Sequence, residues 1–180
     1  MNRQVCGTPS RSPSPGYRDA VLAHAQSQLG CPYIWPDQAN RWALGKGQKL
    51  PDGRRTFDCS GLVSVCLTEV LPGFSVKGQR VVPAYWNAHR YYSNTELAAG
   101  PDEGPDVLVL AFWGSPERCI HVELVFPDGR SIGAVGGNSR TVSVDIAEAR
   151  GARVRTRPHY TAGRTKDFLA LHRLPLAPSP

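Results

Sequence analysis

The segment Thr-Phe-Asp-Cys-Ser-Gly-Leu-Val at residues 56–63 constrains the fold most, because it sets a polar residue and a cysteine directly before an apolar, periodic stretch. Apolar residues recur at spacings of three and four from Cys59 to Val70, which predicts a helix that buries one face. Asp58 is the expected N-cap, and Leu-Pro-Gly at 71–73 ends the helix because proline cannot continue the hydrogen-bond ladder. The chain is therefore predicted to be organised around a helix that opens on Cys59.

A cysteine in the first turn of a helix has a chemical consequence. The first backbone N–H groups lack intrahelical partners and the helix dipole is positive there, so a thiolate at Cys59 is stabilised. Gly61 lowers the helix propensity, and its missing side chain would let a substrate backbone approach. We interpret Cys59 as a nucleophile. The alternative is a small buried hydrophobe, which is the role of most free cysteines.

The length of the chain fits one folded domain. A chain of 180 residues can bury a core without disulfide staples. Residues 1–16 contain Ser-Arg-Ser-Pro-Ser-Pro and are predicted to be a flexible arm, and residues 175–180 are predicted to be a proline-rich tail. The domain itself is expected to cover residues 17–174.

Helical patterns come first along the domain, and strand patterns come later. A first helix is expected over residues 17–29, and a long polar loop over residues 37–55. The aromatic residues between 85 and 92 are interpreted as core side chains, in part on a short helix, and the alternative is that they line a cleft. Helices followed by strands indicate an α+β fold with an antiparallel sheet. Strands are predicted over residues 107–112, 119–126, 130–135, 141–146 and 168–174.

His121 is the candidate general base. Strand alternation places His121 and Glu123 on one face and Val122 and Leu124 on the other. A histidine that faces a helix start carrying a cysteine can take the thiol proton and later give it to the leaving amine. The alternative is a strand histidine satisfied by a neighbouring carbonyl. The remaining histidines compete for the same role: His24, His89, His159 and His172.

Composition excludes several classes of protein. The five cysteines include no C-x-x-C or other zinc-site spacing, so we expect no metal. No apolar run is long enough for a membrane span, and the N-terminal segment lacks the apolar core of a secretory signal. The net charge of +6 suits a polyanionic partner such as a bacterial envelope or nucleic acid, and the alternative is a solvated basic face without a partner. No nucleic-acid motif accompanies the charge.

Four segments, taken in their order along the chain, carry a resemblance to a known family. They are Gln-Ser-Gln-Leu-Gly-Cys-Pro-Tyr-Ile-Trp at 26–35, Phe-Asp-Cys-Ser-Gly-Leu-Val at 57–63, Gly-Pro-Asp-Val-Leu-Val at 104–109 and His-Val-Glu-Leu-Val at 121–125. In this order they resemble the landmarks of the NlpC-type cysteine peptidases, which are papain-like hydrolases of bacterial cell-wall peptides. The resemblance implies an α+β, papain-like fold in which N-terminal helices, including the nucleophile helix, pack on a central antiparallel β-sheet.

The resemblance also implies site residues and a substrate class. By position, Cys59 matches the nucleophile and His121 matches the general base. Tyr33 matches a tyrosine that lies beside the nucleophile and can help bind the oxyanion or the substrate, and the Cys59 backbone N–H would be a further oxyanion donor. Family members cut amide bonds of peptidoglycan stem peptides, often next to a D-amino acid, and need no metal or organic cofactor.

The chain departs from the family at the residue that orients the base. The family usually has a third polar residue on the strand after the base histidine, and counting through the hairpin brings Gly133 to that position. Glycine cannot orient an imidazole. We rank Asn138 first as its substitute, because an amide oxygen can accept from the ring N–H. Glu123, a bridging water and a site of two residues are the alternatives.

Together these observations predict a cell-wall endopeptidase that hydrolyses peptidoglycan stem peptides through a Cys-His acyl-enzyme and acts as a monomer. We expect it to be made in the cytoplasm without a signal peptide and to reach the wall by phage-type or secretion-system delivery. Two alternatives use the same fold: an acyltransferase or deamidase, and a catalytically silent phage tail or assembly module. A nucleic-acid binder that uses the late arginines ranks last.

Overall fold

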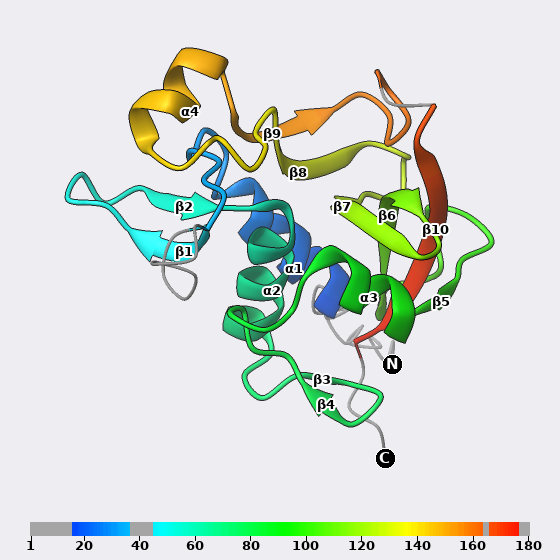
Figure 1. Cartoon of the computed structure of the whole chain (residues 1–180). Helices are drawn as coiled ribbons and strands as arrows, with labels where there is room; N and C mark the ends of the chain where they lie inside the picture. Colours follow the sequence, from blue (N-terminus) through cyan, green and yellow to red (C-terminus); the bar gives the residue numbers. More distant parts are fainter. Residues whose placement is uncertain (1–15, 37–44, 164–165, 177–180) are drawn as a thin grey trace, which may run out of the picture.

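The fold is described from a computed structural model, in which residues 16–36, 45–163 and 166–176 are placed well enough to describe. Helices α1 (Tyr17–Gln26) and α2 (Cys59–Val70) pack beside a six-stranded sheet (Figure 1). Neighbouring strands of this sheet are antiparallel, which confirms the predicted α+β class. The strands in spatial order are β5 (Glu96–Leu97), β10 (Phe168–Pro175), β6 (Val107–Ser115), β7 (Arg118–Val125), β8 (Ser131–Val135) and β9 (Arg153–Arg157).

Helix α2 runs from Cys59 to Val70, as predicted. Its N-cap is Asp58, whose Oδ1 accepts the backbone N–H of Gly61 at 2.6 Å. The expectation of one buried face is too narrow, because every residue from Cys59 to Leu67 is buried. The helix contacts α1 on one side and strands β7 and β8 on another, so it is a central element of the core.

The structure explains the glycine at position 61 differently from the sequence-based interpretation. A Cβ at this position would collide with the carbonyl oxygen of Gly45, and it would lie 3.1 Å from Asp58 Oδ1. The Gly45 carbonyl is held there because it accepts the backbone N–H of Asp58 at 2.6 Å. The missing side chain of Gly61 therefore admits a segment of the protein itself, and not a substrate backbone.

The two faces of the sheet pack against different partners. Leu110, Phe112 and Val122 belong to the main core, which also contains the buried residues of α1 and α2. The opposite face carries a smaller cluster around Trp113 and Val125, on which Phe168 packs. His121 pairs with Trp113 across β6 and β7, so His121 stands on the face of the smaller cluster. The buried apolar side chains on both faces leave the sheet largely covered.

The prediction of a strand over residues 141–146 is wrong. Helix α4 (Val144–Arg150) begins there, with Ser143 as its N-cap and Gly151 in the left-handed conformation at its end (φ 61°). The alternation of Val142, Val144 and Ile146 is typical of a strand, but the capping residues at both ends stabilise a helix here. The structure instead has a strand that was not predicted, β9. Three of its five residues are arginines, so it has few of the apolar residues by which the other strands were recognised.

Other elements differ from the expectation in smaller ways. Helix α1 ends at Gln26, and turns lead from there to Gly30. The segment predicted as one polar loop contains a hairpin of β1 (Lys46–Lys49) and β2 (Arg55–Phe57). Its first part, residues 37–44, lies outside the described residues. The remaining elements are β3 (Ser75–Val76), β4 (Gln79–Arg80) and α3 (Ala88–Asn94).

Two of the aromatic residues before the sheet, Trp86 and Tyr91, lie in the core as predicted, whereas Tyr85 is 58% exposed. Trp86 and Tyr91 are at most 1% exposed, and their rings lie 4.8 Å apart. The predicted N-terminal arm falls outside the described residues except for Gly16, as does most of the predicted tail. Strand β10 extends to Pro175, and Leu176 is buried after it. Among the helices described, none is long and apolar enough to span a membrane.

Candidate active site

Cys59 is the first residue of α2, and a buried ion pair stands directly beside it. The ammonium of Lys46, on β1, lies 2.8 Å from Asp58 Oδ2 and donates to Ser60 Oγ at 2.9 Å. The Lys46 and Asp58 side chains are only 7% and 8% exposed. Ser60 also donates to Asp58 Oδ1 at 2.9 Å. The helix start is therefore fixed by polar contacts on both sides of the cysteine.

The resting form of Cys59 is the thiol. Burial, followed by the negative charge of Asp58, raises the pKa of Cys59 to about 12. A hydrogen bond from the backbone of Val122, the charge of Lys46 and the backbone of Ser60 oppose this shift. The expected stabilisation of a thiolate by the helix start is thus outweighed by burial. Attack by Cys59 then requires a neighbouring base that takes its proton.

The hydrogen bond from Val122 brings Cys59 beside the strand that carries His121. Among the described residues, β7 and β8 pair at Leu124 with Ile132 and at Val125 with Ser131. The upstream part of β7 lies beyond this ladder, and its edge meets the start of α2 at Val122. Val122 directly follows His121 in the chain. The fold therefore places the sulfur of Cys59 next to the backbone of the predicted base.

His121 is buried and held by a carboxylate. Its Nε2 lies 2.9 Å from Oε1 of Glu123, two residues along the same strand face, as the alternation predicts. Its ring packs on Trp113, with the ring centroids 5.3 Å apart. The His121 side chain is 8% exposed and that of Glu123 is fully buried. The orientation of the imidazole is set within the protein.

Glu123 has two further partners. Ser131 Oγ donates to its Oε2 at 2.6 Å, and Arg157 Nε lies 3.1 Å from its Oε1. Burial alone raises the pKa of this carboxyl, but the hydrogen bond and charge of His121, followed by Ser131 and Arg157, leave the pKa of Glu123 below its ordinary value. Glu123 is therefore an ionised, buried carboxylate at neutral pH.

Asn138 lies in a different set of contacts. Its Oδ1 accepts the backbone N–H of Arg140 and the side chain of Arg150, each at 2.9 Å. Its backbone N–H donates to Thr141 at 3.1 Å. The amide oxygen that was expected to hold His121 is thus engaged at the start of the loop before α4. The structure brings Glu123 to His121 and places Asn138 with Arg150.

Tyr33 is buried, with 3% of its surface exposed. A Cβ on Gly137 would collide with the Tyr33 ring, so this ring lies directly on the Gly137 backbone. The backbone N–H of Tyr33 donates to Ala152, and an isolated bridge joins Tyr33 to Phe57. Tyr33 itself does not line the cleft described next, whereas Trp35, two residues further along the chain, does. Its predicted oxyanion role stays a prediction.

A cleft of about 610 Å³ opens beside Cys59. It carries both signs of charge, from Lys46 and Arg118 and from Asp58 and Glu117. A cleft of this size can hold a short peptide, and Glu117 and Arg118 are its exposed charges, since Lys46 and Asp58 are buried and paired with each other. The residues that line it are Trp35, Pro36, Lys46, Asp58, Cys59, Ser60, Ala84, Tyr85, Asn87, Ala88, His89, Glu117, Arg118, Cys119 and Ile120.

The cleft is also lined by a second histidine and a second cysteine, His89 and Cys119, which are alternative candidates for the base and the nucleophile. Nδ1 of His89 accepts the backbone N–H of Cys119 at 3.4 Å, so His89 is tied to the rim. A bulge at Ile120 interrupts the strand alternation, so Cys119 packs in the main core and not on the face of His121. Burial raises the pKa of Cys119 to about 11. Cys119 also lacks the helix start that positions Cys59.

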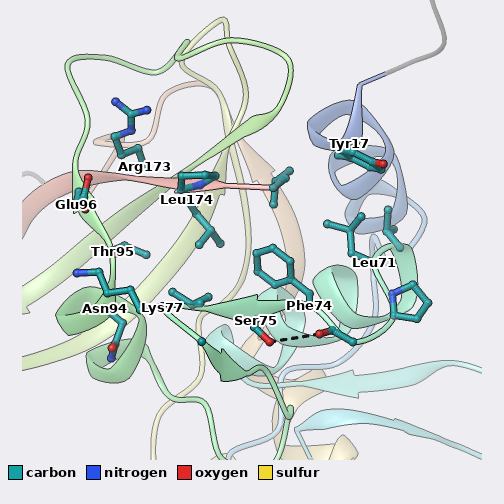
Figure 2. A pocket seen from close by; sticks show the side chains of 17 residues that line it. Tyr17, Leu71, Phe74, Ser75, Lys77, Asn94, Thr95, Glu96, Arg173 and Leu174 are labelled. Atoms are coloured by element: carbon teal, nitrogen blue, oxygen red, sulfur yellow. Dashed lines mark hydrogen bonds between the residues drawn. The ribbon is translucent and has the colours of Figure 1, made fainter. Parts of the chain in front are cut away.

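A second, larger groove of about 690 Å³ lies at the other end of α2 (Figure 2). Leu71, Phe74 and Leu174 contribute apolar side chains to it, and Tyr17 closes one side. Neither Cys59, His121 nor Glu123 lines this second groove. Among the described residues, no group of His, Cys, Asp or Glu side chains has an arrangement that could hold a metal ion.

Comparison with known proteins shows the fold. None of the protein-family models matches the sequence, and no curated protein matches it. The P60 domain of an antigen from M. avium subspecies paratuberculosis is similar in structure, with a TM-score of 0.55 at 19% identity over 90% of this chain and 96% of that one. The chain therefore has the fold of NlpC/p60 domains, as its sequence resemblance implied.

Two further structures show the range of this fold. NlpC1 from Trichomonas vaginalis matches with a TM-score of 0.55 at 18% identity over 92% of this chain, but this chain covers 46% of that protein. RipD from Mycobacterium tuberculosis matches with a TM-score of 0.52 at 18% identity over 89% of this chain and 98% of RipD. RipD is described as a non-catalytic NlpC/p60 domain protein adapted to peptidoglycan binding. The fold alone does not decide between catalysis and binding.

Proposed function

We propose that this protein is a cysteine peptidase that hydrolyses amide bonds in peptidoglycan stem peptides. One observation carries the proposal: the buried thiol of Cys59 meets the backbone of β7 at Val122, the residue that directly follows the carboxylate-bound His121. The peptidoglycan substrate comes from proteins of the same fold, such as the peptidoglycan hydrolase RipB from Mycobacterium tuberculosis, with a TM-score of 0.52 at 21% identity. Delivery by a phage or a secretion machine stays a prediction.

The proposed reaction has two stages. Because Nε2 of His121 faces Glu123, Nδ1 is the nitrogen assigned to the thiol proton. The sulfur attacks the amide carbonyl, the imidazolium gives its proton to the leaving amine, and a thioester remains on Cys59. Water then gives a proton to the imidazole and attacks the thioester, which releases the carboxylate product and restores the thiol. The backbone N–H of Cys59 is the proposed donor to the oxyanion.

The test is digestion of purified sacculi, with soluble products identified by mass spectrometry. Wild-type protein should release cleaved stem peptides, and Cys59→Ala should lower the rate by about 10³-fold or more. Cys119→Ala is the matched control, because it removes the other thiol of the cleft and should keep the activity. Equal release by wild type and Cys59→Ala would contradict the proposal.

A second candidate is peptidoglycan binding without cleavage. It is favoured by the raised pKa of Cys59 and by the glycine at position 133. It predicts that wild-type protein and Cys59→Ala sediment equally with sacculi while neither releases a peptide. Cys59 of the intact protein would then also resist alkylation at neutral pH.

A further inference from the structure

The carboxylate of Glu123 is the most enclosed charge beside the candidate site. It is fully buried, and three side chains meet it: His121 at 2.9 Å, Ser131 at 2.6 Å and Arg157 at 3.1 Å. The Arg157 contact is an ion pair whose Nε is poorly aligned for a hydrogen bond. Arg157 is itself held by its Nη1, which donates to the carbonyl of Ala162 at 2.7 Å. A charge buried in this way is costly unless partners compensate it, and these three side chains supply that compensation.

Gly133 makes room for this carboxylate. It lies on β8, across from β7, and a Cβ added to it would stand 2.5 Å from Cγ and 3.0 Å from Cδ of Glu123. Its backbone is not left-handed, so space alone requires glycine here. The stem of Glu123 therefore fills the volume into which any side chain at position 133 would project.

We propose that Glu123 is the positioning residue of His121, and that the polar group expected on β8 has moved to β7 in this protein. The inference rests on the proposed function. An ionised carboxylate on Nε2 fixes the ring, so that Nδ1 is the nitrogen assigned to the thiol proton, and it stabilises the imidazolium that forms when the thiol gives up its proton. Ser131 and Arg157 hold the carboxylate in place from two sides. Gly133 and Glu123 thus form a complementary pair, which explains why glycine stands at that position.

The first test is Glu123→Gln, which keeps the size of the side chain and removes its charge. We expect kcat to fall by about 10²-fold with little change in KM, since a positioned acid–base group contributes at least this much. The acidic limb of the kcat profile, which reports the imidazole acting as base, should move to lower pH by about one unit because a carboxylate favours the charged ring. A role limited to stability would leave this limb in place. An unchanged limb and kcat in a folded variant would overturn the inference.

The second test exchanges the two positions. Glu123→Gly alone should lose activity, and adding Gly133→His should regain about 10-fold, because the two sites act on one ring and their effects are not additive. Gly133→Ala alone should also lower kcat by displacing the Glu123 stem. Folding of each variant is checked by circular dichroism. If the double variant folds and is no more active than Glu123→Gly, position 133 does not substitute for Glu123 and the exchange is refuted.

A substrate-free readout separates this inference from the proposed function. Alkylation of Cys59 by iodoacetamide, followed by peptide mass spectrometry, measures how well His121 activates the thiol. Glu123→Gln should slow this reaction at pH 7, whereas Asn138→Ala, the matched control, should not. If wild type fails to digest sacculi but the alkylation rates differ in this way, only the substrate class is wrong. Equal alkylation of wild type and Glu123→Gln would refute the positioning role whatever the substrate is.

Discussion

The ammonium of Lys46 and the carboxylate of Asp58 form a buried ion pair, 2.8 Å apart, immediately before Cys59. Asp58 has two tasks at this point: it caps α2 through Gly61, and its charge opposes ionisation of the neighbouring thiol. Lys46 reaches it from the β1–β2 hairpin, in a segment that the sequence presented as a polar loop. The hairpin therefore compensates the cap charge beside the cysteine.

Replacing Lys46 with methionine should destabilise the protein and slow the thiol. Removing one partner leaves Asp58 buried and unpaired, which costs about 3 kcal/mol of unfolding free energy. The uncompensated charge also raises the pKa of Cys59 further, so alkylation at pH 7 should slow. Urea unfolding and iodoacetamide kinetics measure the two effects. Lys49→Met, at an exposed position on the same strand, is the control. Equal stability of the two variants would show that the ion pair contributes nothing.

Gly61→Ala should disrupt the start of α2. The new Cβ would collide with the Gly45 carbonyl, and overpacking of this kind costs about 1–3 kcal/mol. Helix propensity alone would favour alanine, so the sign of the change decides between the two effects. Gly100→Ala is a suitable control, because a Cβ there meets nothing within 4 Å. The measurement is the midpoint of urea unfolding. A more stable Gly61→Ala variant would show that Gly45 can move away.

Local sequence predicted the parts of the site that depend on neighbours along the chain. The N-cap of Asp58, the helix that opens on Cys59 and the shared face of His121 and Glu123 follow from spacing alone. The partner of His121 on the face of the sheet could not be read in this way. Choosing between Glu123 and Asn138 requires knowing that Gly133 leaves space on β8, and that contact joins residues on different strands.

The loop around Asn138 shows the same limit in another form. The residue that engages Asn138 is Arg150, at the end of α4. The start of this helix imitated a strand because its apolar residues alternate, and the cap at Ser143 is a weaker signal than the alternation. Because α4 was not predicted as a helix, the contact between Arg150 at its end and Asn138 could not be foreseen.

Acid should remove the stabilising contribution of Glu123. Its pKa is lowered in the folded protein, so its ionised form adds stability above the unfolded value near 4.5, and this contribution is lost as the pH falls through the folded pKa. Wild type should therefore be more stable than Glu123→Gln at pH 7, and the difference should shrink below pH 4.5. Urea unfolding at several pH values gives both curves. A difference that stays constant down to pH 3 would mean that Glu123 is not ionised in the fold.

Cys59 should carry no thiolate at neutral pH in the resting protein. Burial raises the pKa of Cys59 to about 12, so the thiolate absorbance near 240 nm should be the same for wild type and Cys59→Ser at pH 7. Activity would then depend on a neutral His121 that takes the proton during attack, and it should fall on acidification as the imidazole becomes charged. The absorbance difference between the two proteins, followed from pH 5 to pH 10, tests this order of events. A thiolate signal that is already complete at pH 6 would instead indicate a preformed thiolate–imidazolium pair, and the proton transfer would then precede substrate binding.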